Sequence, residues 1–267
     1  MIREPVVAGQ FYPQTEASLR KMLSKLIDAS AEKQEAKGII MPHAGYVYSG
    51  HVAGAAVSRV EIKKTIIILG TNHSGAGKRF GIMTKGSWST PLGEAKIDTE
   101  IAGAILKPSD LIEEDSLSHL CEHSIEVEIP FFQYLRPDIR IVPITVSQGK
   151  IEEYQTLGKD IAEGYKKIGR SALFAASTDF THYESREAAE KKDGLAIDAI
   201  LALDEERLCR VVEENNISMC GAPPTCTLIS ICKNLGASRS GLVKYQTSGD
   251  ISGDYSSVVG YAGFVIT

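Results

Sequence analysis

The chain has 267 residues, of which 43% are hydrophobic and 24% charged, proportions that are ordinary for a globular protein. A net charge of −5 argues against a nucleic-acid-binding protein, which would need a basic face. No apolar run approaches the roughly 18 residues of a membrane helix, and Met1–Pro5 does not begin a signal peptide. We therefore expect a cytoplasmic protein without membrane contact.

The first half of the chain alternates predicted helices with short strands. Four consecutive apolar residues, Ile66–Leu69, predict a strand that is buried on both faces. The predicted strands cover residues 38–41, 66–69, 80–84 and 94–98, and the predicted helices cover 18–29, 50–60, 100–106 and 124–135. We expect Thr99 to cap the third helix and Pro130 to kink or shorten the fourth.

The second half continues the same alternation. Strands are predicted at residues 140–146, 171–177, 242–247 and 256–266, and helices at 151–168, 186–203, 205–213 and 224–235. Alternating strands and helices predict an α/β fold, a three-layer α/β/α sandwich around a mostly parallel or mixed sheet. We expect one domain over residues 1–267.

Three predicted strands end in polar loops that contain a histidine: His43, His73 and His182. In open α/β sheets, ligands bind beyond the carboxyl ends of the strands. Imidazole is the commonest protein ligand for zinc, iron and copper, so His43 and His73 together indicate a metal site. This pair lacks a third ligand.

Four residues are candidates for the third ligand: Asp179, Glu122, His123 and Cys220. Asp179 lies three residues before His182, a spacing typical of a base and its orienting carboxylate, although it could also cap a turn. Cys220 precedes a predicted helix, whose amino terminus would favour a thiolate. Spacing alone does not choose among the four.

The other histidines and cysteines of interest have structural interpretations. We expect His51 to be a packing or surface residue, His119 and Cys121 to lie in a loop, and Cys226 and Cys232 to pack in the core. An odd number of cysteines, five, does not suggest a disulfide framework. No glycine-rich phosphate loop follows any strand, and Ser177 lacks a Gly-x-Ser-x-Gly elbow, which disfavours serine hydrolysis.

The order of the motifs along the chain resembles the Memo family. Five segments carry the resemblance most strongly: Pro42–Tyr46, Leu69–His73, Glu122–Glu126, Ser177–His182 and Cys220–Gly221. Three more segments also fit: Val7–Pro13, Thr90–Gly93 and Ser256–Ala262. The resemblance implies a fold similar to class III extradiol ring-cleaving dioxygenases, whose iron is held by two histidines and a carboxylate.

The resemblance also implies roles for individual residues. His43 and His73 match the two metal histidines, and Cys220 matches the third ligand, where the dioxygenases have glutamate. His182 falls at the position of their acid/base histidine, oriented here by Asp179, and His123 falls near a second active-site histidine. A thiolate in place of a carboxylate shifts the metal preference towards Fe(II), Zn or Cu(I).

The implied function is metal-dependent redox chemistry with oxygen, on a small aromatic or unknown substrate, with Fe(II) as the first choice of metal and Cu or Zn as the others. The alternative is a non-enzymatic adaptor that binds a peptide or protein in the same crevice, because Memo proteins of animals are linked to signalling and peptide binding. A zinc hydrolase would lack a dedicated carboxylate base. A homo-oligomer is compatible with the sequence.

Overall fold

The centre of the fold is a group of four parallel strands. A computed structural model describes all residues, 1–267, and contains a sheet of 12 strands. Its central strands lie in the order β8 (Arg140–Val146), β3 (Thr65–Thr71), β9 (Ala172–Ser177) and β2 (Gly38–Met41). Nearly every residue in them is buried, as expected for strands that are covered on both faces.

The edges of the sheet are mixed. Beside β2 lies the antiparallel strand β12 (Val258–Ile266), which also pairs with β11 (Ser240–Thr247) and β10 (His182–Glu184). Beyond β8 follow β6 (Gly93–Ile97), β5 (Ser87–Thr90) and β1 (Ile2–Arg3), while β4 (Phe80–Ile82) pairs with β8 and β7 (Glu113–Glu114). The sheet is therefore parallel at its centre and contains antiparallel pairs towards both edges.

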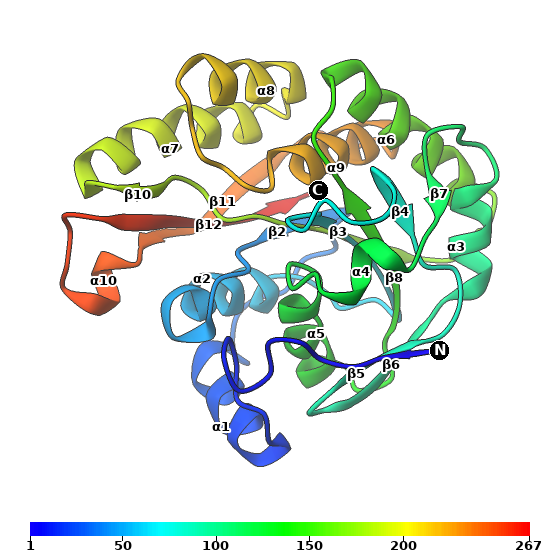
Figure 1. The fold of residues 1–267 in the computed structure, drawn as a ribbon, viewed down its shortest axis with the longest axis horizontal. Helices are drawn as coiled ribbons and strands as arrows, with labels where there is room; N and C mark the ends of the chain where they lie inside the picture. Colours follow the sequence, from blue (N-terminus) through cyan, green and yellow to red (C-terminus); the bar gives the residue numbers. More distant parts are fainter.

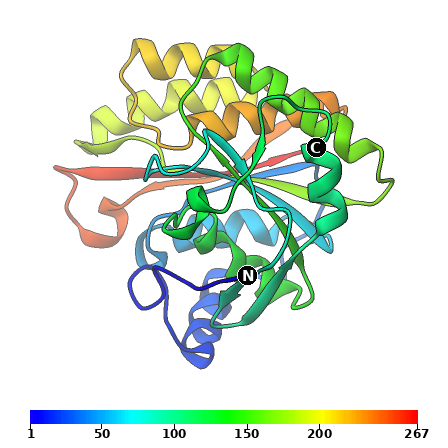
Figure 2. The ribbon, with the colours of Figure 1, turned by 45° about the vertical axis from the view of Figure 1, so that its right-hand side comes forward.

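Helices cover both faces of this sheet (Figures 1 and 2). One layer contains α6 (Ile151–Lys166), α7 (Arg186–Leu201), α8 (Glu205–Glu214) and α9 (Ala222–Asn234), and the other contains α1 (Glu16–Leu26), α2 (Tyr46–Ser58) and α5 (Ile129–Leu135). The remaining helices are α3 (Thr99–Leu106), α4 (Leu117–Leu120), α10 (Gly249–Ser252) and the 3₁₀ turn Glu126–Glu128. This arrangement confirms the predicted α/β fold. None of the helices is long and apolar enough to span a membrane.

Some predicted elements differ from the structure in their bounds. The helix expected from residue 124 starts at Ile129, after a 3₁₀ turn, and Pro130 occupies its first turn, where the missing N–H costs nothing. Asp98, not Thr99, caps α3, because its side chain accepts a hydrogen bond from the Ile101 amide. The sequence does not predict the short strands β5 and β10. β10 is held by pairing with the distant strand β12, whereas β5 pairs both with β1 and, in a tight hairpin, with the neighbouring β6.

His119 is not the loop residue that the sequence predicts. It lies in α4 and is fully buried, with its ring edge-on to Trp88 at a centroid separation of 5.7 Å. The Arg3 guanidinium stacks over the same Trp88 ring, 4.3 Å from its centroid, and its Nε donates to the His119 carbonyl at 3.1 Å. His119 is therefore a packing residue, and His51 is exposed on α2.

Replacing His119 with phenylalanine is expected to flatten the pH dependence of stability. Burial lowers the pKa of His119 to about 4. Between pH 6.5 and 4, a proton therefore binds His119 only in the unfolded chain, so the free energy of unfolding decreases as the pH decreases through this window. Between pH 7 and 5 the metal-free wild type should lose about 1–2 kcal/mol more than the variant in urea unfolding. Equal losses in the two proteins would contradict this assignment.

Candidate metal centre

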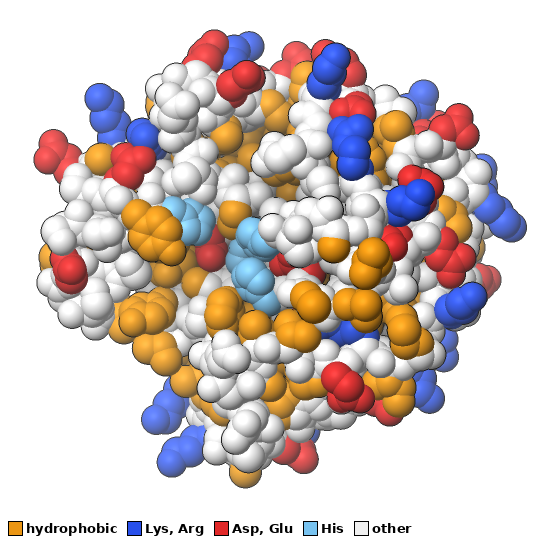
Figure 3. Space-filling view, viewed as in Figure 1, with side chains coloured by type: hydrophobic (Ala, Val, Ile, Leu, Met, Phe, Trp, Pro, Cys, Tyr) orange, Lys and Arg blue, Asp and Glu red, His pale blue; other side chains and the backbone are white.

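The candidate site lies where the central parallel strands end. Met41 of β2 pairs with Ser177 of β9, so these two strands end side by side. His43 follows two residues after Met41, and His73 follows two residues after the last residue of β3. The site therefore occupies the predicted crevice beyond the carboxyl ends of the strands. Figure 3 shows histidine side chains reaching the surface in the middle of one face.

Three histidines form a cluster at this crevice. His43, His73 and His123 each direct one ring nitrogen so that these three atoms lie within 4.8 Å of one another. The rings of His73 and His123 stack at 4.8 Å, and the His43 ring stands edge-on to both, at 5.2 Å and 5.4 Å. The structure thus brings His123 together with the two histidines that the sequence paired.

His43 is held so that its Nε2 faces the cluster. Its Nδ1 lies 2.8 Å from Ser177 Oγ. Ser177 has a single proton, for which the Ser124 carbonyl at 2.7 Å and Glu128 Oε1 at 3.0 Å are the acceptors, so the Nδ1–H of His43 is the donor to Ser177. This hydrogen bond leaves Nε2 as a free donor atom for a metal.

Glu122 orients the ring of His73, as Ser177 orients that of His43. Glu122 is buried, and its Oε1 accepts a hydrogen bond from His73 Nδ1 at 2.9 Å, while its Oε2 accepts from the His73 amide at 2.6 Å. Oε1 also accepts from the amides of His123 and Ser124, at 3.0 Å and 2.9 Å. Burial raises the pKa of Glu122, but these hydrogen bonds outweigh it and bring the pKa to about 2. Glu122, one candidate for the third ligand, is thus fully engaged in orienting His73.

Replacing Glu122 with glutamine is expected to weaken metal binding about 10- to 100-fold, because the amide loses the charge that orients His73 and raises its basicity. Competition against a chelator measures this, with Glu32→Gln at an exposed position as the matched control. Because the pKa of Glu122 is lowered in the folded protein, its carboxylate stabilises the fold above pH 4.5, and this stabilisation is lost as the pH falls towards 2. The glutamine variant should not show this loss in acid. Affinity equal to that of the control would contradict the assigned role.

Cys220 reaches the same cluster from the loop before α9. Its Sγ lies 3.2 Å from His43 Nε2 and accepts a hydrogen bond from the Asp179 amide at 3.4 Å. Two ligands of a tetrahedral zinc ion, one nitrogen and one sulfur, lie about 3.5 Å apart, so this pair is close to ligand spacing. A Cβ at Gly221 would lie 2.4 Å from the Ser177 carbonyl oxygen, so only glycine lets the loop approach β9.

Burial keeps two groups of the cluster uncharged. Burial, followed by the charges of His123 and His73, lowers the pKa of His43 well below its ordinary value. His43 is therefore neutral, as a metal ligand must be. Burial raises the pKa of the Cys220 thiol, so a bound cation is needed to hold it as a thiolate.

Asp179 and His182 lie beside the cluster but do not form the predicted pair. Asp179 accepts a hydrogen bond from the His43 amide at 2.9 Å, and burial raises its pKa to about 6. The His182 ring is held by Ser218 instead, with Nδ1 2.8 Å from the Ser218 carbonyl. The reason is that His182 begins β10, whose pairing with β12 fixes its backbone beside the Ser218 segment.

The sequence did not reveal several groups that complete the site. The sequence presents Ser177 only as a possible nucleophile, whereas in the structure its hydroxyl orients His43. Phe11 packs edge-on against His123 at 5.0 Å, and Ser218 holds His182. No local pattern could indicate these two contacts, because each joins segments that are distant in sequence.

Known proteins resemble this chain over nearly its whole length. The model of the Memo-like protein family matches residues 3–265. A MEMO1 family protein of Methanopyrus kandleri is 41% identical over 99% of both chains, and one of Methanothermobacter thermautotrophicus is 42% identical over 98% of this chain and 99% of its own. The crystal structure of an uncharacterized protein from Escherichia coli K12 shares the fold, with a TM-score of 0.53, 10% identity, and coverage of 86% of this chain and all of that one. The chain therefore belongs to the Memo family.

Proposed function

We propose that this protein binds a transition-metal ion through His43, His73 and Cys220, with His123 as a further group in ligand range. The proposal is supported most by the convergence of the ring nitrogens of His43, His73 and His123 within 4.8 Å, with the Cys220 Sγ 3.2 Å from His43 Nε2. Each of His43 and His73 also has its other ring nitrogen engaged by a hydrogen-bond partner, the usual arrangement behind a metal ligand.

The donor set suits Fe(II), Cu or Zn, and the resemblance to the iron-dependent dioxygenases makes Fe(II) our first choice. Imidazole nitrogens suit iron, copper and zinc, whereas a thiolate disfavours the hard cations Mg²⁺ and Ca²⁺. Three protein ligands on one side of an ion leave positions open for other molecules. The site is therefore suited to a catalytic rather than a purely structural metal.

The proposed activity is dioxygenase-like oxidoreductase chemistry on a small aromatic substrate. Bound Fe(II) would supply a redox-active centre to which oxygen and substrate have access. Partly exposed His182, held by Ser218, is placed to exchange a proton with a bound molecule, and Asp179, with a pKa of about 6, can share that role. His123 can stabilise negative charge that develops beside it.

Oxygen uptake by the anaerobically Fe(II)-loaded protein, with a panel of catechols, tests this activity. We expect uptake that depends on the catechol and falls at least about 100-fold in His182→Ala, while the iron content stays unchanged. An iron-loaded protein that is inert towards every catechol would rule out this substrate class and leave the metal site as a separate question.

A second candidate function is peptide binding in the same crevice. Tyr183, directly after His182, is 80% exposed, and Tyr48 is 43% exposed. Both are close enough to contribute to the raised pKa of Tyr261, after burial and the charge of Asp179. Exposed aromatic side chains are typical anchors for a peptide. Binding of a partner that His73→Ala abolishes, in a protein inert towards catechols, would favour this function.

A further inference from the structure

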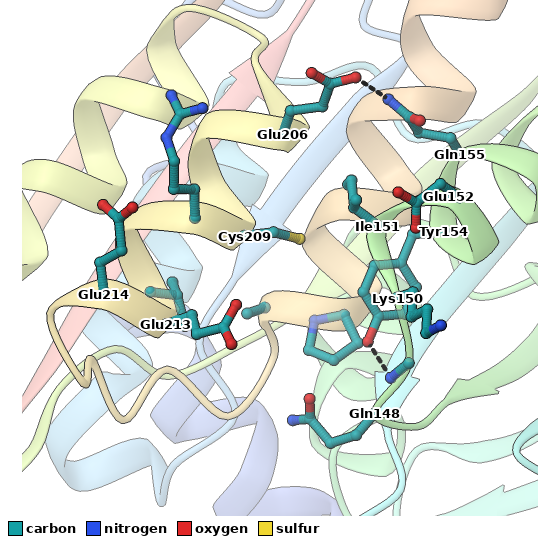
Figure 4. Close-up of a pocket in the computed structure, with 15 residues that line it drawn as sticks. Gln148, Lys150, Ile151, Glu152, Tyr154, Gln155, Glu206, Cys209, Glu213 and Glu214 are labelled. Carbon is teal, nitrogen blue, oxygen red and sulfur yellow. Dashed lines mark hydrogen bonds between the residues drawn. The ribbon is translucent and has the colours of Figure 1, made fainter.

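A large cavity lies between the helices of one layer, away from the histidine cluster. It has a volume of about 920 Å³ and is lined by the segment that leads into α6, by α8 and by the first residues of α9 (Figure 4). Cavities of this size accommodate small organic molecules. Cys209 lines it from α8, and Figure 4 shows the Cys209 sulfur pointing away from that helix.

Behind Cys209 lies a second thiol. The Cys226 Sγ, on α9, is 2.9 Å from the Cys209 Sγ, and neither cysteine is part of a disulfide. Cys226 also donates to the Glu205 carbonyl at 3.5 Å, so its sulfur is the acceptor for the Cys209 S–H. The two sulfurs would need to approach by only about 0.9 Å to reach the length of a disulfide bond.

The two thiols differ in their exposure to solvent. Cys226 is completely buried, whereas Cys209 is partly exposed and adjoins the cavity. A reagent that enters the cavity thus meets Cys209 first, and Cys226 is placed to attack the product. An accessible thiol with a buried partner in contact is the arrangement of an attacking and a resolving cysteine.

We propose that Cys209 and Cys226 form a dithiol site that reduces a low-molecular-weight disulfide, preferably a cationic one, inside this cavity. The preference follows from charge. Four carboxylates line the cavity against two cationic side chains: Glu152, Glu206, Glu213 and Glu214 against Lys150 and Arg210. An excess of negative charge attracts a cationic ligand and repels an anionic one such as glutathione disulfide.

The reaction proceeds in two balanced exchanges. The Cys209 thiolate attacks one sulfur of the small disulfide, whose S–S bond breaks and releases one thiol, which takes up the proton that Cys209 lost. The deprotonated Cys226 sulfur then attacks Cys209 Sγ, and the second small thiol leaves with the Cys226 proton. Two electrons pass to the small disulfide, and a Cys209–Cys226 disulfide remains. This inference does not depend on the metal site.

The test treats the purified full chain with cystamine, a cationic disulfide, and separately with glutathione disulfide. The exposed Cys121 is first replaced with serine, because its thiol would compete. Thiol titration and fragment-ion sequencing of the digest should show the loss of two thiols and a bond between Cys209 and Cys226, with Cys220 and Cys232 unmodified. We divide each rate by the rate of a free thiol with the same disulfide. After this correction, the protein should react about 10-fold faster with cystamine than with glutathione disulfide.

Two variants separate the roles of the cysteines. Cys226→Ser should stop at a stable mixed disulfide on Cys209, with one cysteamine added, and Cys209→Ser should not react at Cys226. The proposal fails if the parent protein keeps a mixed disulfide at Cys209 despite an intact Cys226, or if Cys220 or Cys232 reacts as fast as Cys209. Faster reaction with glutathione disulfide would overturn the preference for a cation.

Discussion

Replacing Arg3 with methionine is expected to lower the free energy of unfolding by about 3–5 kcal/mol, the usual cost of breaking a buried ion pair from one side. Arg3 is 2% exposed and forms an ion pair with the fully buried Glu126. Its Nη2 also donates to the Glu122 carbonyl at 2.6 Å. In the variant, the Glu126 carboxylate would stay buried without its counter-charge.

The Glu126 carboxylate connects Arg3 to the histidine cluster. It accepts hydrogen bonds from the amides of Val6 and Val7, at 2.9 Å and 3.0 Å, and from the Tyr12 hydroxyl at 2.6 Å. These contacts fix the amino-terminal segment, whose Phe11 packs against His123. Losing Arg3 should therefore loosen the His123 side of the cluster as well as the fold.

Urea unfolding of three variants checks this expectation. Arg3→Met/Glu126→Gln should regain part of the loss, because it leaves no buried unpaired charge. Arg20→Met is the matched control, because Arg20 forms an exposed pair with Glu16 one helical turn away, and it should cost about 0.5 kcal/mol or less. A loss for Arg3→Met as small as that for Arg20→Met would contradict the assigned role of Arg3.

Replacing His43 with alanine is expected to reduce the affinity for Fe(II) at least about 100-fold, more than the loss of an orienting residue costs. His43 is 2% exposed, its ring stands edge-on to both other histidines, and its Nε2 lies 3.2 Å from Cys220 Sγ. Anaerobic reconstitution followed by metal analysis measures the effect. His51→Ala, at an exposed position on α2, removes a histidine outside the cluster and should bind iron like the wild type.

The same measurement on Cys220→Ser and His123→Ala decides which side chain is the third ligand. A larger loss in Cys220→Ser would support the thiolate, and a larger loss in His123→Ala would replace it with imidazole. Unchanged iron stoichiometry in both His43→Ala and Cys220→Ser would exclude the proposed site.

Much of the fold could be predicted because its signals are local. The apolar run Ile66–Leu69 is a buried central strand, and the order of strands and helices defines the α/β fold. The placement of His43 and His73 at one edge followed from the parallel pairing expected of such strands. These features depend on residues that are neighbours in sequence.

The groups that position the metal residues could not be predicted in the same way. Glu122 holds His73 across 49 positions, and Ser177 holds His43 across 134 positions. Periodicity and spacing carry no information about such contacts. For the same reason the sequence left four candidates for the third ligand, whereas the structure shows Glu122 engaged behind His73.

X-ray absorption at the metal edge of the zinc-loaded protein reports directly on the ligand set His43, His73 and Cys220. We expect nitrogen ligands at about 2.0–2.1 Å and one sulfur ligand at about 2.3 Å. The sulfur contribution should disappear in Cys220→Ser, and a nitrogen contribution should weaken in His73→Ala. A wild-type spectrum without sulfur, unchanged by either substitution, would contradict a metal site built from His43, His73 and Cys220.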